Sequence, residues 1–331
     1  MDFFPFKNVL LYKQIKSIIM GFLSSLFGSN NNAESNIEKN FDILKYDGIR
    51  ALRIGKITYA IKCLKEALEI QKDIETMNYL ASAYIQVNQL DEAKNVIVSI
   101  TDMEPNEPTH FLSLANLCYM MEDYQGMNEA CNKVLSIDNQ IPVAYFLSAK
   151  AAIGLRNAIQ AVAMLTKAIL LKEDYNEAYL LRAEVLWNMH QAKDAMEDIE
   201  KVLEFIPEDE SALLLKAEIM ATSGDTSQAM VLIDEVLSLN PFNEMAYLLK
   251  GNLLLALKEV EKAIEVYDDA IELKPDFAQA YHERGRAKLE KGDKEGSMED
   301  MKRSMELAPQ NGITINGQYN NYENLTKNVP F

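Results

Sequence analysis

The chain has 331 residues, 48% of them hydrophobic, and this length suits either two ordinary domains or one extended array of repeats. Its 33 basic and 50 acidic side chains give a net charge of −17, which disfavours nucleic acid as a partner because the surface repels phosphates on average. The three cysteines, Cys63, Cys118 and Cys131, cannot all pair and show no C-x-x-C spacing, so we expect buried thiols in a reducing, cytoplasmic compartment.

Residues 1–28 form an amphipathic N-terminal segment that differs from the rest of the chain. Lys7, Lys13 and Lys16 stand against Asp2, a local charge of +2, and apolar residues recur every three or four positions over residues 11–27. The uncharged stretch is too short to span a membrane. Three alternatives remain: the segment packs on the first repeat or in the groove of the repeats, rests weakly on a membrane surface through residues 9–27, or is cleaved. In the second case the protein is membrane-associated, and in the third case it is exported. Residues 29–40, which include three consecutive asparagines, are predicted to be a linker.

From residue 41 to residue 309 the chain repeats itself with a period of 34 residues. The period is marked by prolines, namely Pro207, Pro241, Pro275 and Pro309, with Pro105 three periods before the first of these. If each proline takes position 32, seven repeats begin at residues 74, 108, 142, 176, 210, 244 and 278. An eighth repeat, one residue out of register, begins near residue 41.

Each repeat has small residues at two fixed positions. Position 8 is occupied by Gly48, Ala81, Ala115, Ala149, Ala183, Ala217, Gly251 and Gly285. Position 20 is Ala60, Ala93, Ala161, Ala195, Ala229 and Ala263, with Met127 and Ser297 as exceptions. Apolar side chains around them complete two stripes at helical spacing. Two antiparallel helices approach closely only where side chains are small, so each repeat is predicted to be a helical hairpin that packs on its neighbours.

This pattern resembles the tetratricopeptide repeat family over about residues 41–309. The part nearest to the family consensus runs from Tyr247 and Gly251 through Ala263, Tyr267 and Pro275. The resemblance implies an all-α fold, an α-solenoid that forms a right-handed superhelix of about eight helix-turn-helix repeats. It also implies a concave groove lined by the first helix of each repeat, and a role as a protein-interaction scaffold or adaptor that binds a peptide or helix of a partner protein.

Positions 5, 9 and 12 of each repeat lie together on the first helix, on the side that the resemblance assigns to the groove. The candidate partner-binding residues are Leu112, Asn116, Tyr119, Phe146, Lys150, Leu180, Glu184, Trp187, Leu214, Glu218, Leu248, Asn252, His282 and Arg286. One interpretation is a binding track anchored by aromatic side chains, in which Glu184 and Glu218 bind a Lys or Arg of the ligand. The alternative is that positions 5 and 12 simply pack between successive first helices.

Chaperone-binding members of the family clamp a C-terminal carboxylate with lysine, asparagine and arginine at set places. Lys45 fits the first of these places, but Ile49 and Tyr79 occupy later ones, so we expect that clamp to be absent.

The sequence indicates neither an enzyme nor a cofactor or metal site. The histidines, His110, His190 and His282, lie in three different repeats, which argues against a shared metal or catalytic triad. No glycine-rich phosphate loop is present. Residues 310–331 form an Asn-rich C-terminal tail. Because no capping helix is evident, either this tail covers the last repeat or the protein forms a homodimer through its C-terminal repeat. A second functional hypothesis is a peripheral membrane assembly factor anchored by the N-terminal segment.

Overall fold

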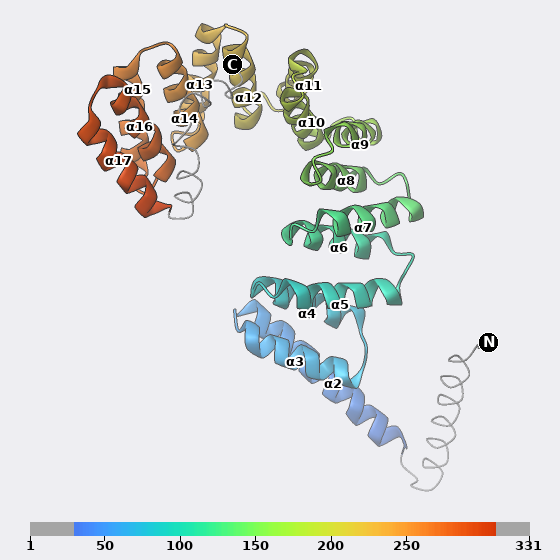
Figure 1. Ribbon diagram of the computed structural model, residues 1–331. Coiled ribbons are helices and arrows are strands. Elements are labelled where there is room, and N and C mark those ends of the chain that lie inside the picture. Colours follow the sequence, from blue (N-terminus) through green and yellow to red (C-terminus); the bar gives the residue numbers. More distant parts are fainter. Residues whose placement is uncertain (1–29, 309–331) are drawn as a thin grey trace, which may run out of the picture. The chain divides into compact units, whose positions relative to one another are not determined.

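The computed structural model describes residues 30–308, with side chains from residue 37 onward, and divides at Gln140 into two compact units. All the regular elements within this range are α-helices, sixteen in number (Figure 1). The first unit contains α2 (Asn30–Arg53), α3 (Ile57–Ile70), α4 (Ile74–Gln86), α5 (Leu90–Met103), α6 (Pro108–Met120) and α7 (Tyr124–Ile137). Consecutive helices in it pack against each other, and α2 also contacts α4.

The second unit contains ten helices with the same alternation. They are α8 (Pro142–Gly154), α9 (Ala158–Leu171), α10 (Asn176–Asn188), α11 (Ala192–Phe205), α12 (Glu210–Thr222), α13 (Thr226–Leu239), α14 (Glu244–Ala256), α15 (Val260–Leu273), α16 (Ala278–Lys291) and α17 (Lys294–Leu307). The predicted all-α solenoid is confirmed. Every first helix from α4 to α16 begins at the residue that the 34-residue period indicates.

The first helix is longer than the sequence predicted. α2 begins at Asn30, so residues 30–40, which were predicted to lie in a linker over residues 29–40, are helical. The physical reason is that asparagine costs a helix interior less than about 1 kcal/mol relative to alanine, which three asparagines do not turn into a helix stop. The predictions for residues 1–28 and 310–331 lie outside the described residues.

The small residues at positions 8 and 20 stand where the two helices of a repeat cross. Every alanine at these positions is at most 4% exposed. A Cβ added to Gly48 would lie 2.7 Å from Cγ of Leu64, and one added to Gly251 would lie 2.3 Å from the Tyr267 ring. The crossings are therefore as tight as the sequence pattern implied, because these distances leave no room for another carbon atom.

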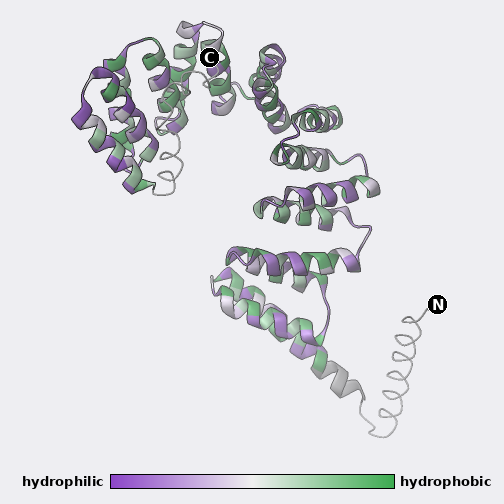
Figure 2. Cartoon of the chain, viewed as in Figure 1, coloured by the Kyte–Doolittle hydropathy of each residue, from purple (hydrophilic) through white to green (hydrophobic). Residues whose placement is uncertain are grey.

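The apolar core runs from one repeat into the next. In the second unit, one cluster joins Ala183, Ala195 and Ile199 of α10 and α11 to Ala212 and Ile219 of α12. Hydrophobic and hydrophilic residues both occur along each helix, as Figure 2 shows. A single hairpin could not cover its apolar stripes, so each repeat depends on its neighbours for burial.

The turn inside each hairpin has one backbone geometry. The residue at position 15 has a positive φ in all eight described repeats, as a glycine in Gly55, Gly224 and Gly292 and as another residue type in Asn88, Glu122, Arg156, His190 and Lys258. This left-handed residue reverses the chain between the two helices. His190, with a φ of 62°, is thus a turn residue.

Candidate functional site

The first helices of the second unit form one continuous face. α10 contacts α12, α12 contacts α14, and α14 contacts α16, whereas the second helices contact chiefly the helices next to them in sequence. The indole Nε1 of Trp187 on α10 donates a hydrogen bond to Oε1 of Glu218 on α12, at 3.2 Å. Position 12 of one repeat therefore touches position 9 of the next. We call positions 5, 9 and 12 of α8, α10, α12, α14 and α16 the first-helix face.

The apolar members of this face are only partly exposed. Phe146, Leu180, Leu214 and Trp187 are half-buried, and the Phe146 ring lies 5.2 Å from the Tyr175 ring between centroids. Leu180 and Trp187 also pack against the core cluster beneath them. Each of these side chains is therefore in contact with neighbouring helices on one side, and its other side remains exposed to solvent and open to a partner.

Leu248 departs from this pattern and corrects one predicted site residue. It is 4% exposed and belongs to the core cluster that includes Leu254 and Tyr267. A side chain buried to this extent offers a partner almost no contact area, so Leu248 is removed from the candidate binding residues.

The polar side chains of the face differ in how many hydrogen bonds or ion pairs they form with neighbouring residues. Glu184 is exposed and has no hydrogen bond or ion pair with any other described residue. Its pKa is raised because surrounding protein displaces part of the water that would solvate the carboxylate. Glu218, also exposed, accepts the Trp187 hydrogen bond. Asn252 accepts a hydrogen bond from the hydroxyl of Tyr267 at 3.1 Å.

At the C-terminal end of the face, the charged residues pair with one another. Glu283 is buried and lies 3.0 Å from Nδ1 of His282, and it accepts a hydrogen bond from Nη1 of Arg286 at 2.6 Å. Burial alone would raise the pKa of Glu283, but its contacts with His282 and Arg286 outweigh that effect and lower it. His282 is half-buried and Arg286 is exposed. Lys150, on α8, has its ammonium 5.9 Å from the centroid of the Phe146 ring.

The predicted residues of the first unit are on α6. Leu112 is half-buried, Asn116 is exposed, and Tyr119 is 41% exposed with its ring 6.4 Å from that of Tyr124. Lys45, the one residue that matched the chaperone clamp, is buried and pairs with Asp73 at 2.9 Å and Glu75 at 2.6 Å. The Lys45 ammonium therefore forms ion pairs that join α2 to the start of α4.

Sequence reasoning missed a ladder of cations at position 7 of the last four repeats. Each of them contacts position 25 of the preceding repeat: Arg182 with Thr166, Lys216 with Glu200, Lys250 with Asp234, and Arg284 with Asp268. The ladder joins consecutive repeats. The signal that would have found it is a basic residue 16 positions after an oxygen-bearing side chain, recurring every 34 residues.

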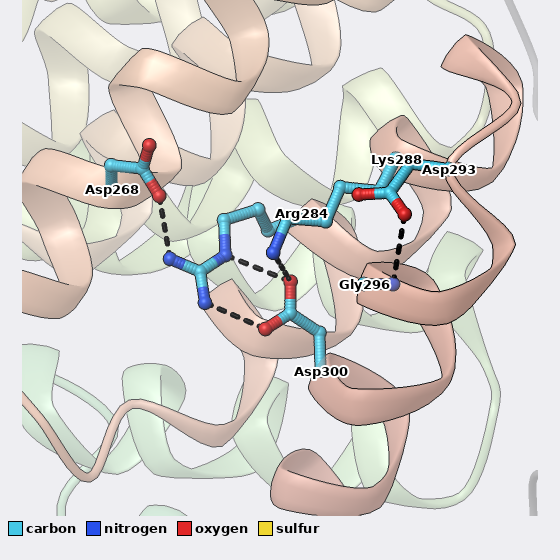
Figure 3. Close-up of polar contacts among 6 residues, drawn as sticks. All are labelled: Asp268, Arg284, Lys288, Asp293, Gly296 and Asp300. Atoms are coloured by element: carbon cyan, nitrogen blue, oxygen red, sulfur yellow. Dashed lines mark hydrogen bonds and ion pairs between the residues drawn. The ribbon is translucent and has the colours of Figure 1, made fainter.

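Two of these arginines also bind a buried aspartate of their own repeat. Nε and Nη2 of Arg284 reach both carboxylate oxygens of Asp300, at 2.8 and 2.6 Å, and Lys288 pairs with the same carboxylate (Figure 3). Arg182 binds Asp198 with the same two-pronged geometry. Such bidentate pairs satisfy a carboxylate that would otherwise be buried without partners.

Within residues 30–308 we also searched for metal sites, membrane-spanning helices and cavities. They contain no group of three or more His, Cys, Asp or Glu side chains placed to hold a metal ion. No helix within residues 30–308 has the length and apolarity to cross a membrane. An open cavity of about 400 Å³ in the first unit lies beside Lys94, Cys118 and Asp123, and one of about 280 Å³ in the second unit lies beside Phe242 and Phe277.

Three family models match the chain inside its repeats. A model of the TPR repeat matches residues 251–292, a model of the tetratricopeptide repeat matches residues 278–311, and the model of anaphase-promoting complex (cyclosome) subunit 3 matches residues 188–270. These are the same residues whose helix boundaries and tight crossings follow the 34-residue period. Residues 251–311 of the chain are therefore repeats of the tetratricopeptide type. No curated protein matches the sequence of this tetratricopeptide repeat protein.

Several solved structures share its fold. The APC/C hetero-tetramer Cut9–Hcn1 contains a chain that is 14% identical, with a TM-score of 0.55, and the match covers 76% of this chain and 50% of that one. The chain described here therefore spans half the length of that similar protein. A tetratricopeptide repeat protein from Parabacteroides merdae is 16% identical over 82% of this chain and 94% of its own, with a TM-score of 0.53. The type IV pilus biogenesis factor PilW is 16% identical over 61% and 94%, with a TM-score of 0.55.

Proposed function

We propose that this tetratricopeptide repeat protein is a protein-interaction scaffold that binds a peptide or helix of a partner along the first-helix face of its second unit. The observation that carries the proposal is the continuity of that face, since Trp187 of one repeat bonds to Glu218 of the next. Half-exposed apolar side chains occupy position 5 of three consecutive first helices, at Phe146, Leu180 and Leu214. A contiguous row of partly exposed apolar groups with polar spacers is what an amphipathic helix or extended peptide needs.

The known proteins support the same class of function. Cut9 is solved in a hetero-tetramer with Hcn1, and the P. merdae structure is that of a tetratricopeptide repeat protein, 94% of which the match covers. Tetratricopeptide repeat proteins in general serve as scaffolds rather than as enzymes, and we propose no catalytic role for Glu184 and Glu218. The net charge of −17 favours protein over nucleic acid as the partner.

The test is a pull-down with the double variant Phe146→Glu, Leu180→Glu. The matched control is Ile159→Glu, Val231→Glu, which makes the same chemical change at two exposed apolar side chains of the second helices. We expect partners captured by the wild type to be lost with the first variant and kept with the second. Circular dichroism must show equal helicity in all three proteins. Recovery of the same partners by both variants would contradict the proposal.

A second role, as a peripheral membrane assembly factor, is motivated by the amphipathic pattern of residues 1–28. Fractionation of the full chain and of a chain that lacks residues 1–28 distinguishes the two. Membrane association that disappears with the segment supports this role, and an unchanged cytoplasmic distribution argues against it.

We also propose that the C-terminal repeat forms a homodimer. Met298 and Met305 of α17 are 74% and 41% exposed, and a further repeat would normally cover such side chains. Light scattering of the full chain, and of a chain without residues 311–331, gives the mass. A monomer in both cases refutes the dimer.

A further inference from the structure

The Trp187 indole has one glutamate as a neighbour on its own helix and contacts another on the next first helix. Glu184 is three residues before Trp187 on α10, and residues three apart on a helix are neighbours on its surface. Glu218 comes from α12 and accepts the indole N–H at 3.2 Å. This hydrogen bond fixes the ring against α12. Two acidic groups and an aromatic ring, drawn from two consecutive repeats, thus meet at one place.

This place has negative charge that the described residues do not neutralise. Glu184 has no ion pair or hydrogen bond there, and Glu218 has one neutral donor, the indole. The position 7 cations of the same two repeats are engaged elsewhere, since Arg182 binds Asp198 and Lys216 binds Glu200. The raised pKa of Glu184 means that its ionised form lacks full solvation, a cost that an added cation would reduce.

The charge changes along the face in a way that marks this site. Position 9 is Lys150 on α8, then Glu184, then Glu218, then the neutral Asn252, then Arg286 on α16. Only the α10–α12 step within the second unit places two negative side chains next to each other at this position. A cationic group would meet a lysine at position 9 of α8 and two carboxylates at the centre of the face, so the centre is the place that attracts it.

We propose that the partner peptide carries an arginine that binds at this centre, with its guanidinium stacked on Trp187 and paired with Glu184 and Glu218. Arginine suits the site better than lysine because its planar guanidinium stacks on an aromatic ring while its N–H groups pair with carboxylates. The half-exposed Leu180 and Leu214 then contact apolar residues on either side of that arginine. This inference rests on the proposed function and names the chemistry of the partner.

The test starts from a phage library of random 12-residue peptides, selected on the full chain. We expect the selected peptides to be enriched in arginine at one position, with apolar residues beside it. Trp187 is the only tryptophan of the chain, so its fluorescence reports binding at this face without a label. In a titration of a selected peptide, replacing its arginine by uncharged citrulline should weaken binding by about tenfold or more, and replacing it by lysine should weaken binding less.

The protein variants separate a local contact from general attraction to an acidic protein. Glu184→Gln, Glu218→Gln removes both charges at the site and keeps an acceptor for the indole N–H. Its matched control, Glu235→Gln, Glu272→Gln, removes two exposed charges from the second helices. We expect the first variant to lose about tenfold in affinity for the arginine peptide and almost nothing for the citrulline peptide. The control should bind both peptides as the wild type does. Equal losses in both variants would overturn the inference.

Three other results would also overturn it, in distinguishable ways. Peptides without basic residues that are nonetheless lost with Phe146→Glu, Leu180→Glu would leave the proposed function intact and remove the arginine site. Peptides that bind this double variant as well as the wild type would remove both. If a synthetic peptide of residues 1–28 displaces the selected peptide, and a chain without these residues binds it more tightly, then the occupant is the protein's own basic segment and not a partner.

Discussion

Replacing Gly251 by alanine should destabilise the protein, although alanine is the better helix former. A Cβ at this position of α14 would lie 2.3 Å from Cζ and 2.4 Å from Cε1 of Tyr267 on α15. Tyr267 has no exposed surface, and burial raises the pKa of its hydroxyl. A rigid, enclosed ring cannot move away without disturbing its own neighbours, so the added carbon atom must push the two helices apart.

The magnitude follows from two opposing effects. Glycine to alanine in a helix interior is worth about 1 kcal/mol of stabilisation. Overpacking a core by one carbon atom costs about 1–3 kcal/mol. We therefore expect a net loss of up to about 2 kcal/mol in the free energy of unfolding for Gly251→Ala. The sign should reverse after Tyr267→Leu, because four of the five repeats with alanine at position 8, such as the one with Ala183, have an aliphatic residue at position 24, such as Ile199.

The assay is a double-mutant cycle followed by urea unfolding and by hydrogen exchange of α14 and α15. Exchange is needed because repeat arrays lose cooperativity, and a local change is then diluted in the global curve. Gly251→Ala should lower protection of these helices in the wild type and raise it in the Tyr267→Leu background. If alanine stabilises both backgrounds equally, or destabilises both equally, the steric argument is refuted.

The remaining predictions concern ion pairs and turns. Arg284→Met should cost about 1.5–3 kcal/mol by removing two charged hydrogen bonds from the buried Asp300, which keeps Lys288 as a partner, and hydrogen exchange should show the loss first in α16 and α17. Glu122→Gly should stabilise the protein by about 0.5 kcal/mol in urea unfolding, because Glu122 has a φ of 56°, a conformation that is strained for residues other than glycine. An unchanged free energy of unfolding would show that the turn is unstrained. The hydrogen bond from Lys94, with that from the Gly126 N–H, lowers the pKa of Asp123 below its ordinary 3.8. The stability from this carboxylate is therefore complete above about pH 4 and is lost as the pH falls through the folded-state pKa, whereas Asp123→Asn should lack this acid-dependent part.

The sequence alone was sufficient for the repeat and its helices. The 34-residue period, the prolines and the small residues at positions 8 and 20 repeat so regularly that seven first helices begin where the period indicates. These features are local, because a helix start or a tight crossing depends on residues within one repeat. The period also indicated which residues share the first-helix face, since equivalent positions of stacked repeats must lie in a row.

The tertiary structure decided which members of that row are available to a partner. Leu248 occupies the same position as Leu180 and Leu214, yet it is buried while they are half-exposed. The position 7 ladder, which uses the charges of Arg182 and Lys216 between repeats, also became visible only in three dimensions. The physical reason is that exposure and charge pairing depend on side chains one repeat away, whose sizes and charges vary even when the backbone pattern repeats.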